Sequence, residues 1–558
     1  MGEKKNIFIG VAWPYVNGDL HVGHLAGYLI PCDVFARWAR LRGYKVLMVS
    51  GTDCHGTPIT VEADKKGITP YKLIEIYTPR IHKLIETYGI SYDLFTATTT
   101  PNHYQITQEF FLNLLKNGYI IRKKSLQYYS KKEKRFLPDR YVEGECPYCG
   151  AKDQRADQCE ACGRVLDFGE LINPVSKLSK TPVDLKETEH YYIDFVKLQP
   201  LIEAYVKPST HWREWVYKET LGWLKEGLEG RPITRDLDWG VPLPVDKIPK
   251  NMLIEGAENK RFYVWFDAVI GYFSAAIEWA QKQGDKDVWQ EFWLNKDCKH
   301  YYFMGQDNLA FHTIFWPGQL IGQKKGYNLP YFPCVNKYLN LEGKKFSKSR
   351  GVVVDSMEVA QKYGVAAVRF YILSILPENK QSSWQWGEFE EVVNANLVDN
   401  IGNLVQRVIS FYDRFLKQTI KEPNQKIDKV IYEETKKRFN KINDLMPVCR
   451  IREAFEEVVE YGRSLNKYLN ETAPWRLVKS DVNKAERAIY NSLYGVYQLG
   501  VMIEPFVPQV AEKIYEVLGV KGKAGYKEQE FKVEQIKINT GQLPLFEKIR
   551  VKKSLEAG

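Results

Sequence analysis

Two histidines, His21 and His24, lie three residues apart, with a glycine, Gly23, between them. The apolar run at residues 7–9 predicts a buried strand before them, and the apolar periodicity of residues 25–42 predicts a helix after them. Unpaired backbone N–H groups at the start of a helix attract anions, and a glycine lets a ligand approach the backbone closely. The turn is therefore a candidate phosphate site, although two histidines can also cap a turn or bind a metal.

A second candidate stretch lies far downstream, where residues 344–351 read Lys-Lys-Phe-Ser-Lys-Ser-Arg-Gly. Together with the histidine turn, it resembles the two signature motifs of the class I aminoacyl-tRNA synthetases, with Phe346 where the family has methionine. The resemblance implies a catalytic site that binds ATP, in which His21 and His24 contact the α-phosphate region. It also implies that Lys345 and Lys348 stabilise the departing pyrophosphate. ATP is expected to arrive with Mg²⁺, and the sequence contains no P-loop motif.

Four cysteines form a candidate metal site. They are arranged as two Cys-x-x-Cys hooks, nine residues apart and each followed by glycine: Cys146, Cys149, Cys159 and Cys162. Zn²⁺ prefers four thiolates in a tetrahedron, and each hook offers two of them from one tight turn. The spacing therefore predicts one structural zinc ion, the alternative being four unrelated cysteines. The remaining five of the nine cysteines are scattered, which favours reduced thiols over disulfides.

The elements that position these groups begin with a second predicted strand at residues 45–51. A strand, a helix and a strand in this order predict a doubly wound parallel sheet, in which ligands bind beyond the carboxyl ends of the strands. Asp53 lies at such an end. A lone aspartate there is otherwise typical of a helix cap or a turn. In synthetases of this type the aspartate of the Gly-Thr-Asp-x-His-Gly-Thr motif binds the ammonium group of the amino acid, and Asp53 matches it.

Aromatic residues are concentrated in two later stretches. Residues 262–272 predict a strand leading into a helix, with the sheet resuming near Gly240, and residues 300–305 predict another strand before the aromatic residues 311–316. Taken singly, each aromatic residue is typical of a core. Together the stretches resemble the methionyl-tRNA synthetases, and the resemblance extends from residue 7 to about residue 544. It implies ATP contacts at Gly305 and Asp307. It implies a methionine pocket formed by Ala12, Trp13, Tyr15, Asp53, Trp265, Ala268, Tyr272, His312 and Phe315, where Trp13 replaces the leucine of the best-known members.

Long helical patterns, such as residues 392–417 and 451–469, follow near the C-terminus and predict an α-helical bundle. Asn403 and Arg407 are four residues apart and therefore share one helix face. Trp475 follows an Ala-Pro pair. These residues are also compatible with an exposed polar pair and a core tryptophan, but the resemblance implies that all three bind the anticodon.

The sequence thus predicts an α/β protein. Its parts are a Rossmann-like catalytic domain with a doubly wound parallel sheet, a zinc-knuckle insertion and an α-helical anticodon-binding domain. We expect catalytic halves at residues 1–117 and 238–336, the insertion at 118–237, a stem-contact region with the lysine loop at 337–390, the anticodon domain at 391–545 and a charged tail at 546–558. The insertion is too short for the editing domain of relatives specific for leucine, isoleucine or valine.

Composition sets broader limits. Apolar residues make up 44% and charged residues 27% of the 558 residues, as is usual for a soluble globular protein. The net charge of +10 suits a polyanionic partner without specifying one. No apolar run approaches the roughly twenty residues that span a bilayer, and no signal-peptide core is present, so we expect a cytoplasmic protein without membrane contact. We also expect a monomer, because the dimerising module appended to some relatives is missing.

The expected function is activation of L-methionine with ATP, followed by transfer to the 3′-terminal adenosine of initiator and elongator tRNA(Met). One alternative is a class I synthetase for another apolar amino acid, which the short insertion and the aromatic stretches disfavour. A second is a nucleotidyltransferase of the same superfamily, although such enzymes are far shorter. A third is a non-catalytic tRNA-binding paralogue, which the intact signature residues disfavour.

Overall fold

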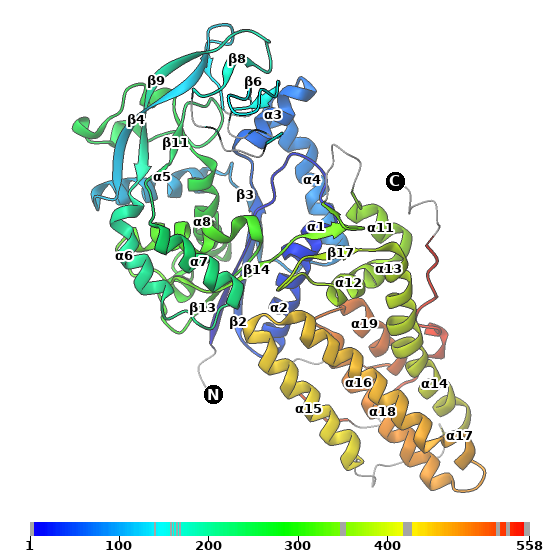
Figure 1. Cartoon of the computed structure of the whole chain (residues 1–558). Helices are drawn as coiled ribbons and strands as arrows, with labels where there is room; N and C mark the ends of the chain where they lie inside the picture. The colour runs from blue at the N-terminus through cyan, green and yellow to red at the C-terminus, as the bar shows by residue number, and fades with distance from the viewer. Residues whose placement is uncertain are drawn as a thin grey trace.

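The computed structural model describes residues 5–138, 141–156, 159, 161–162, 166, 169–345, 353–416, 427–520, 525–531 and 536–551. A body of sheet and helices carries an insertion rich in strands on one side and continues into a long helical bundle on the other (Figure 1). Among the described helices, none combines the length and the apolar character needed to cross a membrane.

Five parallel strands form the central sheet, in the order β14-β13-β1-β2-β3. Their bounds are β1 Asn6–Val11, β2 Lys45–Thr52, β3 Leu94–Ala97, β13 Lys299–Gly305 and β14 Pro330–Asn336. All of β1 is buried, as expected for a strand covered on both faces. The chain runs from β1 to β3 and returns on the other side of β1, so the predicted doubly wound sheet is confirmed. Its switch point lies between the carboxyl ends of β1 and β13.

Helices pack against this sheet, and α2 and α8 both contact β2. The helices of this body are α1 Val22–His24, η1 Leu25–Leu29, α2 Ile30–Leu41, α3 Thr57–Lys66, α4 Pro70–Tyr88, α5 Pro101–Lys116, α8 Val264–Gln283, α9 Gln290–Trp293 and α10 Trp316–Gly322. The first three form one continuous helical run with a π-helical stretch, η1, in its middle. The predicted helix therefore exists, but it begins at Val22 rather than at residue 25.

The stretch at residues 262–272 forms a strand leading into a helix, as predicted, but this strand lies outside the central sheet. Its strand, β12 (Arg261–Phe262), pairs antiparallel with β11 (Thr234–Arg235), outside the central sheet. The helix α8 already begins at Val264, and the sheet resumes with β13 rather than near Gly240. Most of α8 is buried, because it packs against β2 on one side and α5 on another.

The insertion consists mainly of antiparallel strands (Figure 1). One sheet has the order β10-β9-β4-β5 and a smaller one the order β7-β6-β8. The bounds are β4 Ile120–Ser130, β5 Arg135–Phe136, β6 Val142–Glu145, β7 Gln154–Arg155, β8 Ile172–Ser176, β9 Asp184–Ile193, β10 Arg231–Pro232, α6 Phe195–Val206 and α7 Glu214–Glu226. The smaller sheet has its own hydrophobic core, which includes Cys146 and Cys159 and is separate from the main core.

The last part of the chain begins with a small sheet and is otherwise helical. The strands are β15 Leu339–Leu341, β16 Lys344–Lys345 and β17 Ser382–Trp384. The helices are α11 Ser356–Tyr363, α12 Val365–Ser374, α13 Trp386–Val392, η9 Val393–Gly402, α14 Asn403–Phe411, η10 Tyr412–Leu416, α15 Lys429–Leu445, α16 Ile451–Thr472, α17 Pro474–Leu477, α18 Val482–Ile503 and α19 Pro508–Leu518. Contacts of α18 with α14, α16 and α19 confirm the predicted helical bundle. The helical run from α13 to η10 continues without interruption through residue 391, where we expect the anticodon-binding domain to begin. The start of that domain therefore stays a prediction.

A buried arginine, Arg369 of α12, joins three distant parts of the chain. Its Nη2 donates to Asp33 Oδ2 of α2 at 2.8 Å. Its Nη1 and Nε donate to the carbonyl oxygens of Tyr88 and Phe506, each at 3.1 Å. Since the side chains of Arg369 and Asp33 are both 0% exposed, this contact fixes the helical part against the sheet-containing body and is shielded from solvent.

Candidate functional site

The two signature histidines open the helical run that follows β1. Nδ1 of His21 accepts from the N–H of Gly23 at 3.1 Å, and Nδ1 of His24 accepts from the N–H of His21 at 3.2 Å. These bonds cap backbone N–H groups that a helix start leaves unpaired. Since Nδ1 is an acceptor in both rings, Nε2 carries the proton and is a donor. A helix start with two imidazole donors is suited to binding a phosphate.

The expected nucleotide residues follow β13, the neighbour of β1. Gly305 ends this strand, and Asp307 is exposed in the single turn η6 (Gln306–Asn308). A Cβ on Gly305 would lie 2.9 Å from Asp307 Oδ1, so the glycine allows this close approach. The N–H of Ala12 donates to the carbonyl oxygen of Phe303 at 2.9 Å, which ties the segment leading to the histidines to β13. The histidine turn and Asp307 therefore flank the same switch point.

The lysine motif begins at the end of β16, where Lys345 is placed. The rest of the motif, including Lys348, lies outside the described residues. Immediately after it, the chain returns to the histidine turn, where the N–H of Val22 donates to the carbonyl oxygen of Val354 at 3.1 Å. The described segment after the lysine motif is thus hydrogen-bonded to the helical run of the histidines.

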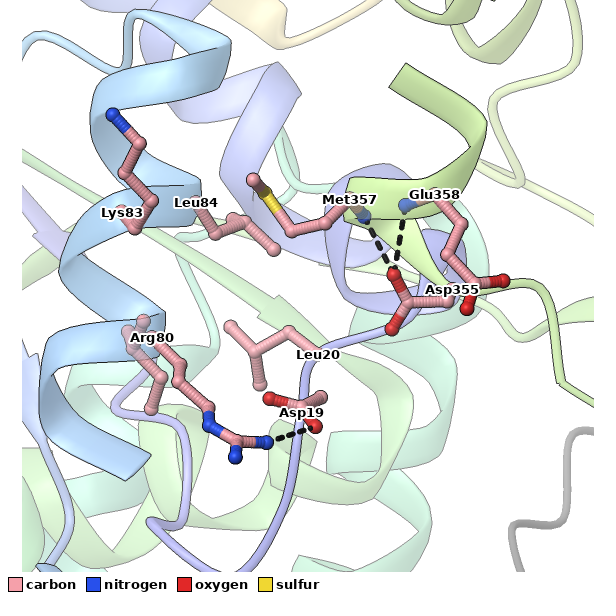
Figure 2. A pocket seen from close by; sticks show the side chains of 9 residues that line it. Asp19, Leu20, Arg80, Lys83, Leu84, Asp355, Met357 and Glu358 are labelled. Atoms are coloured by element: carbon pink, nitrogen blue, oxygen red, sulfur yellow. Dashed lines mark hydrogen bonds and ion pairs between the residues drawn. The ribbon is translucent and has the colours of Figure 1, made fainter. Parts of the chain in front are cut away.

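A cavity of about 300 Å³ borders this junction (Figure 2). Arg80 of α4 pairs with Asp19 at 3.0 Å on one side of it, and Asp355 caps the start of α11 on the other. Its apolar lining consists of Leu20, Ile81, Leu84 and Met357. Its acidic residues Asp19, Asp355 and Glu358 outnumber its basic residues Arg80 and Lys83, so this cavity does not favour a triphosphate and lies beside the candidate ATP site.

Asp53 lies directly beside the segment that carries the first pocket residues. Its N–H donates to the carbonyl oxygen of Pro14 at 2.9 Å, and its carbonyl oxygen accepts from the N–H of Val16 at 3.3 Å. This pairing places Tyr15 opposite Asp53. Burial, and next the charge of Asp267, raise the pKa of Asp53 well above its usual range. A carboxylate in such surroundings is stabilised by a bound cation.

Two residues near Asp53, His55 and Asp267, were not among the predicted site residues. His55 Nδ1 lies 2.6 Å from Asp267 Oδ2, and both side chains are buried. His55 is part of the same Gly-Thr-Asp-x-His-Gly-Thr motif as Asp53, so the sequence contained a signal for it. Asp267 stands within an aromatic stretch, and no spacing in the sequence relates it to Asp53.

The polar wall of the candidate methionine pocket is uncharged. His312 Nε2 lies 2.8 Å from the hydroxyl of Tyr272, and its Nδ1 lies 2.9 Å from the carbonyl oxygen of Asn308. Nδ1 therefore donates to the carbonyl, and Nε2 accepts from the hydroxyl. Burial lowers the pKa of His312 to about 4, so the ring is neutral at neutral pH. A neutral, polarizable wall suits a thioether.

An aromatic cluster stands beside this wall. Trp265, in the first turn of α8, is 51% exposed and meets Phe311 edge-on at 5.0 Å between ring centroids. Phe311 in turn contacts Phe315 at 5.0 Å. Ala268 follows Trp265 on α8 and is partly exposed. Phe311 therefore links two predicted pocket residues, although the sequence analysis assigned it no role.

Trp13 fills a hollow formed by two glycines. A Cβ on Gly51 of β2 would lie 2.3 Å from its ring, and one on Gly271 of α8 would lie 2.8 Å from it. The indole also meets Tyr272 edge-on, at 6.5 Å between centroids. Its buried Nε1 has no hydrogen-bond partner within the described part of the chain. Two residues without side chains thus make room for a side chain larger than leucine.

The four predicted zinc ligands converge. Their sulfur atoms all lie within 4.8 Å of one another, with Cys146–Cys162 at 4.0 Å and Cys149–Cys159 at 3.6 Å. Four thiolates around zinc at about 2.3 Å would be about 3.8 Å apart. The donor set and its spacing therefore fit a tetrahedral metal site that could bind zinc.

Two of the three predicted anticodon residues are in contact at the far end of the bundle. The Arg407 guanidinium lies over the Trp475 ring at 5.2 Å, and Arg407 Nη2 donates to Asn470 Oδ1 at 2.7 Å. Trp475 is 42% exposed, which excludes a core position. Asn403 is exposed one turn before Arg407 on α14. An aromatic face, a cation and an amide thus occupy one exposed surface.

Two family models together match most of the chain. A family model described as tRNA synthetases class I (M) matches residues 7–409. A model described as the anticodon binding domain of methionyl tRNA ligase matches residues 422–552. Two solved structures of the Mycobacterium tuberculosis methionyl-tRNA synthetase with methionyl-adenylate share the fold. One of them has a TM-score of 0.76 at 23% identity, over 95% of this chain and 99% of that one.

Several curated relatives are more similar in sequence. The methionine–tRNA ligase of Roseiflexus sp. is 45% identical over 526 residues, which cover 93% of this chain and 87% of the relative. That of Thermomicrobium roseum is 41% identical over 94% and 88%, and that of Thermococcus kodakarensis 40% identical over 91% and 70%. With its signature histidines and four cysteines placed as described, the chain belongs to the methionyl-tRNA synthetase family of class I aminoacyl-tRNA synthetases.

Proposed function

We propose that this chain joins methionine to tRNA in two steps. It first forms methionyl-adenylate and pyrophosphate from L-methionine and ATP, and it then transfers the methionyl group to the 3′-terminal adenosine of tRNA(Met). The observation that supports the proposal is that three features follow the carboxyl ends of the neighbouring strands β13, β1 and β2: the acidic turn at Asp307, the histidine turn, and Asp53 near an uncharged aromatic wall. The names of the relatives support methionine as the amino acid.

In the first step the methionine carboxylate attacks the α-phosphorus of ATP, and the bond to pyrophosphate breaks. No general base is needed, because the carboxylate is already ionised. His21 and His24 donate hydrogen bonds from Nε2 to the α-phosphate, where charge develops. Lys345 and Lys348 bind the pyrophosphate as it leaves, and Mg²⁺ enters with ATP as the charge partner of its phosphates. Gly305 and Asp307 hold the adenosine.

Methionine is held at both ends. Asp53 binds its α-ammonium group, and the side chain lies among the residues Ala12, Trp13, Tyr15, Trp265, Ala268, Tyr272, His312 and Phe315. His312 is neutral, donates from Nδ1 to the carbonyl oxygen of Asn308 and accepts at Nε2 from the hydroxyl of Tyr272, so this wall offers no charge to a polar competitor. Apolar and aromatic surfaces suit the soft thioether, which favours methionine over amino acids with polar side chains.

In the second step the 2′-hydroxyl of the terminal adenosine attacks the carbonyl carbon of the adenylate, and AMP leaves. Asn403, Arg407 and Trp475 read the anticodon by hydrogen bonding and stacking, in both initiator and elongator tRNA(Met). The four cysteines would hold one Zn²⁺ in a structural role, since four thiolates complete the ligand set of a closed zinc site. The enzyme acts as a monomer in the cytoplasm, where its tRNA substrate is used.

The experiment is ATP–pyrophosphate exchange measured with each of the twenty amino acids. We expect exchange with methionine alone. Exchange with another apolar amino acid instead would assign a different synthetase, and no exchange with any amino acid would assign a non-catalytic paralogue. Lys348→Ala should abolish most of the exchange, whereas Lys344→Ala, just outside the signature motif, serves as the matched control and should retain it.

A further inference from the structure

His55 contacts two buried carboxylates through different atoms. Its backbone N–H donates to Asp53 Oδ1 at 3.3 Å, while its ring Nδ1 lies 2.6 Å from Asp267 Oδ2. The side chains of His55 and Asp267 are 1% and 0% exposed, and Asp53 is also buried. Asp53 follows β2, whereas Asp267 stands in the first turn of α8. Only the packing of α8 on β2 brings these groups together.

The two carboxylates form an unfavourable pair without further positive charge. Burial, and next the charge of Asp267, raise the pKa of Asp53, and burial raises that of Asp267 while His55 opposes the rise. Asp267 Oδ1 is buried and, among the described residues, has no hydrogen-bond partner. A single ammonium group would balance only one of the two negative charges, so a second positive group is needed.

We propose that His55 is a positioning residue for the amino acid: joined to Asp267 as an imidazolium, it cancels that carboxylate's charge, so that Asp53 alone faces the α-ammonium group. This inference rests on the proposed function, because it takes methionine as the ligand of Asp53. It assigns His55 no contact with the substrate. The acid–imidazolium pair acts through Asp53, which it keeps ionised.

The surroundings of the ring fit this role. His55 Nε2 lies 3.3 Å from the hydroxyl oxygen of Tyr104, which can accept the second N–H of an imidazolium. Trp239 meets the ring edge-on at 5.8 Å, and its own Nε1 donates to the carbonyl oxygen of Cys54 at 2.7 Å. The ring is therefore enclosed, and both of its nitrogens face oxygen atoms.

Three variants test the charge balance: His55→Gln, Asp267→Asn and the double variant. The KM for methionine and the KM for ATP are measured in pyrophosphate exchange, together with the melting temperature. His55→Gln leaves Asp267 charged and unbalanced, so the methionine KM should rise about 30-fold or more, with the ATP KM unchanged. Asp267→Asn removes the charge that needs balancing. In the double variant a neutral amide pair replaces the ion pair, and the methionine KM should return to within about fivefold of the wild type.

If His55 had a purely structural role, the second substitution would not restore methionine binding. The methionine KM of the double variant would then be no lower than that of His55→Gln, and this result would overturn the proposal. His300→Gln is the matched control, because His300 is also buried but its ring nitrogens lie beside neutral oxygens, those of Tyr302 and Phe292. It should leave the methionine KM unchanged even if it lowers the melting temperature. If the wild type shows no exchange with methionine, the proposed function itself fails; if it shows exchange but the double variant shows no rescue, only this inference fails.

Discussion

Replacing Arg369 with methionine should weaken the contact between the catalytic body and the helical part by about 3–5 kcal/mol. Methionine fills similar space but donates no hydrogen bond. Asp33 would lose its fully buried counter-charge, and the carbonyl oxygens of Tyr88 and Phe506 would lose their donors. A buried acceptor without a donor costs about 1–3 kcal/mol. The loss of all three hydrogen bonds therefore supports a destabilisation near the upper end of the expected range of about 3–5 kcal/mol.

The assay is urea unfolding followed by tryptophan fluorescence and circular dichroism, since a chain with several parts can unfold in steps. Arg40→Met is the matched control. Arg40 Nη2 also lies 2.8 Å from a carboxylate oxygen, that of Asp93, but the two side chains are 30% and 29% exposed. An exposed pair contributes about 0–1 kcal/mol, so the control should unfold almost as the wild type does. Equal losses in both variants would refute the argument that burial decides the cost.

The same pair predicts a change in pH dependence. Burial acts to raise the pKa of Asp33, but Arg369 and next Arg37 outweigh it, so the folded-state pKa lies below its usual value. Its contribution to stability is therefore present above the unfolded pKa of about 3.9 and is lost as the pH falls through the lower folded value. Arg369→Met removes the main positive charge that lowers the pKa of Asp33. The stability that the protein loses through Asp33 on acidification should therefore be smaller in this variant, or change sign.

Four further predictions concern the metal, the pH, the pocket and the tRNA. Cys162→Ser should release zinc and unfold the small core of the insertion first, because metal-binding energy is local folding energy; stoichiometric zinc in the purified variant would contradict this. Three buried imidazoles should together destabilise the protein by about 3 kcal/mol when the pH falls from about 6.5 to about 5.5, since each is protonated in the unfolded chain but stays neutral in the folded one. Burial lowers their pKa values to about 3 for His103 and about 4 for His300 and His312; urea unfolding of the wild type and of His300→Gln at both pH values checks this, because the variant should lose about 1 kcal/mol less than the wild type. Trp13→Leu should change the relative exchange rates of methionine, norleucine and ethionine while leaving the ATP KM alone; unchanged rates would place Trp13 outside the pocket. Trp475→Ala should slow tRNA charging about 10- to 100-fold without affecting methionine-dependent exchange, because one stacked base contributes about 1–3 kcal/mol; charging at the wild-type rate would contradict the anticodon role.

The sequence by itself determined the groups that lie close together along the chain. The histidine turn, the two cysteine hooks and the strands before Asp53 and Asp307 follow from local spacing and apolar pattern, and the structure confirms those strands and helices. Local pattern predicted the strand and the helix at residues 262–272, but not that this strand pairs with β11 outside the central sheet, because the partner strand lies in another part of the sequence.

Only the tertiary structure decided which distant residues meet. The contact of His55 with Asp267, the packing of Trp13 against Gly51 and Gly271, and the contact of Arg407 with Trp475 each join separate elements. Such contacts depend on how helices and strands pack, and packing is set jointly by many side chains that fill one core. A spacing in the sequence carries no information about that joint arrangement, so these contacts became visible only in the folded chain.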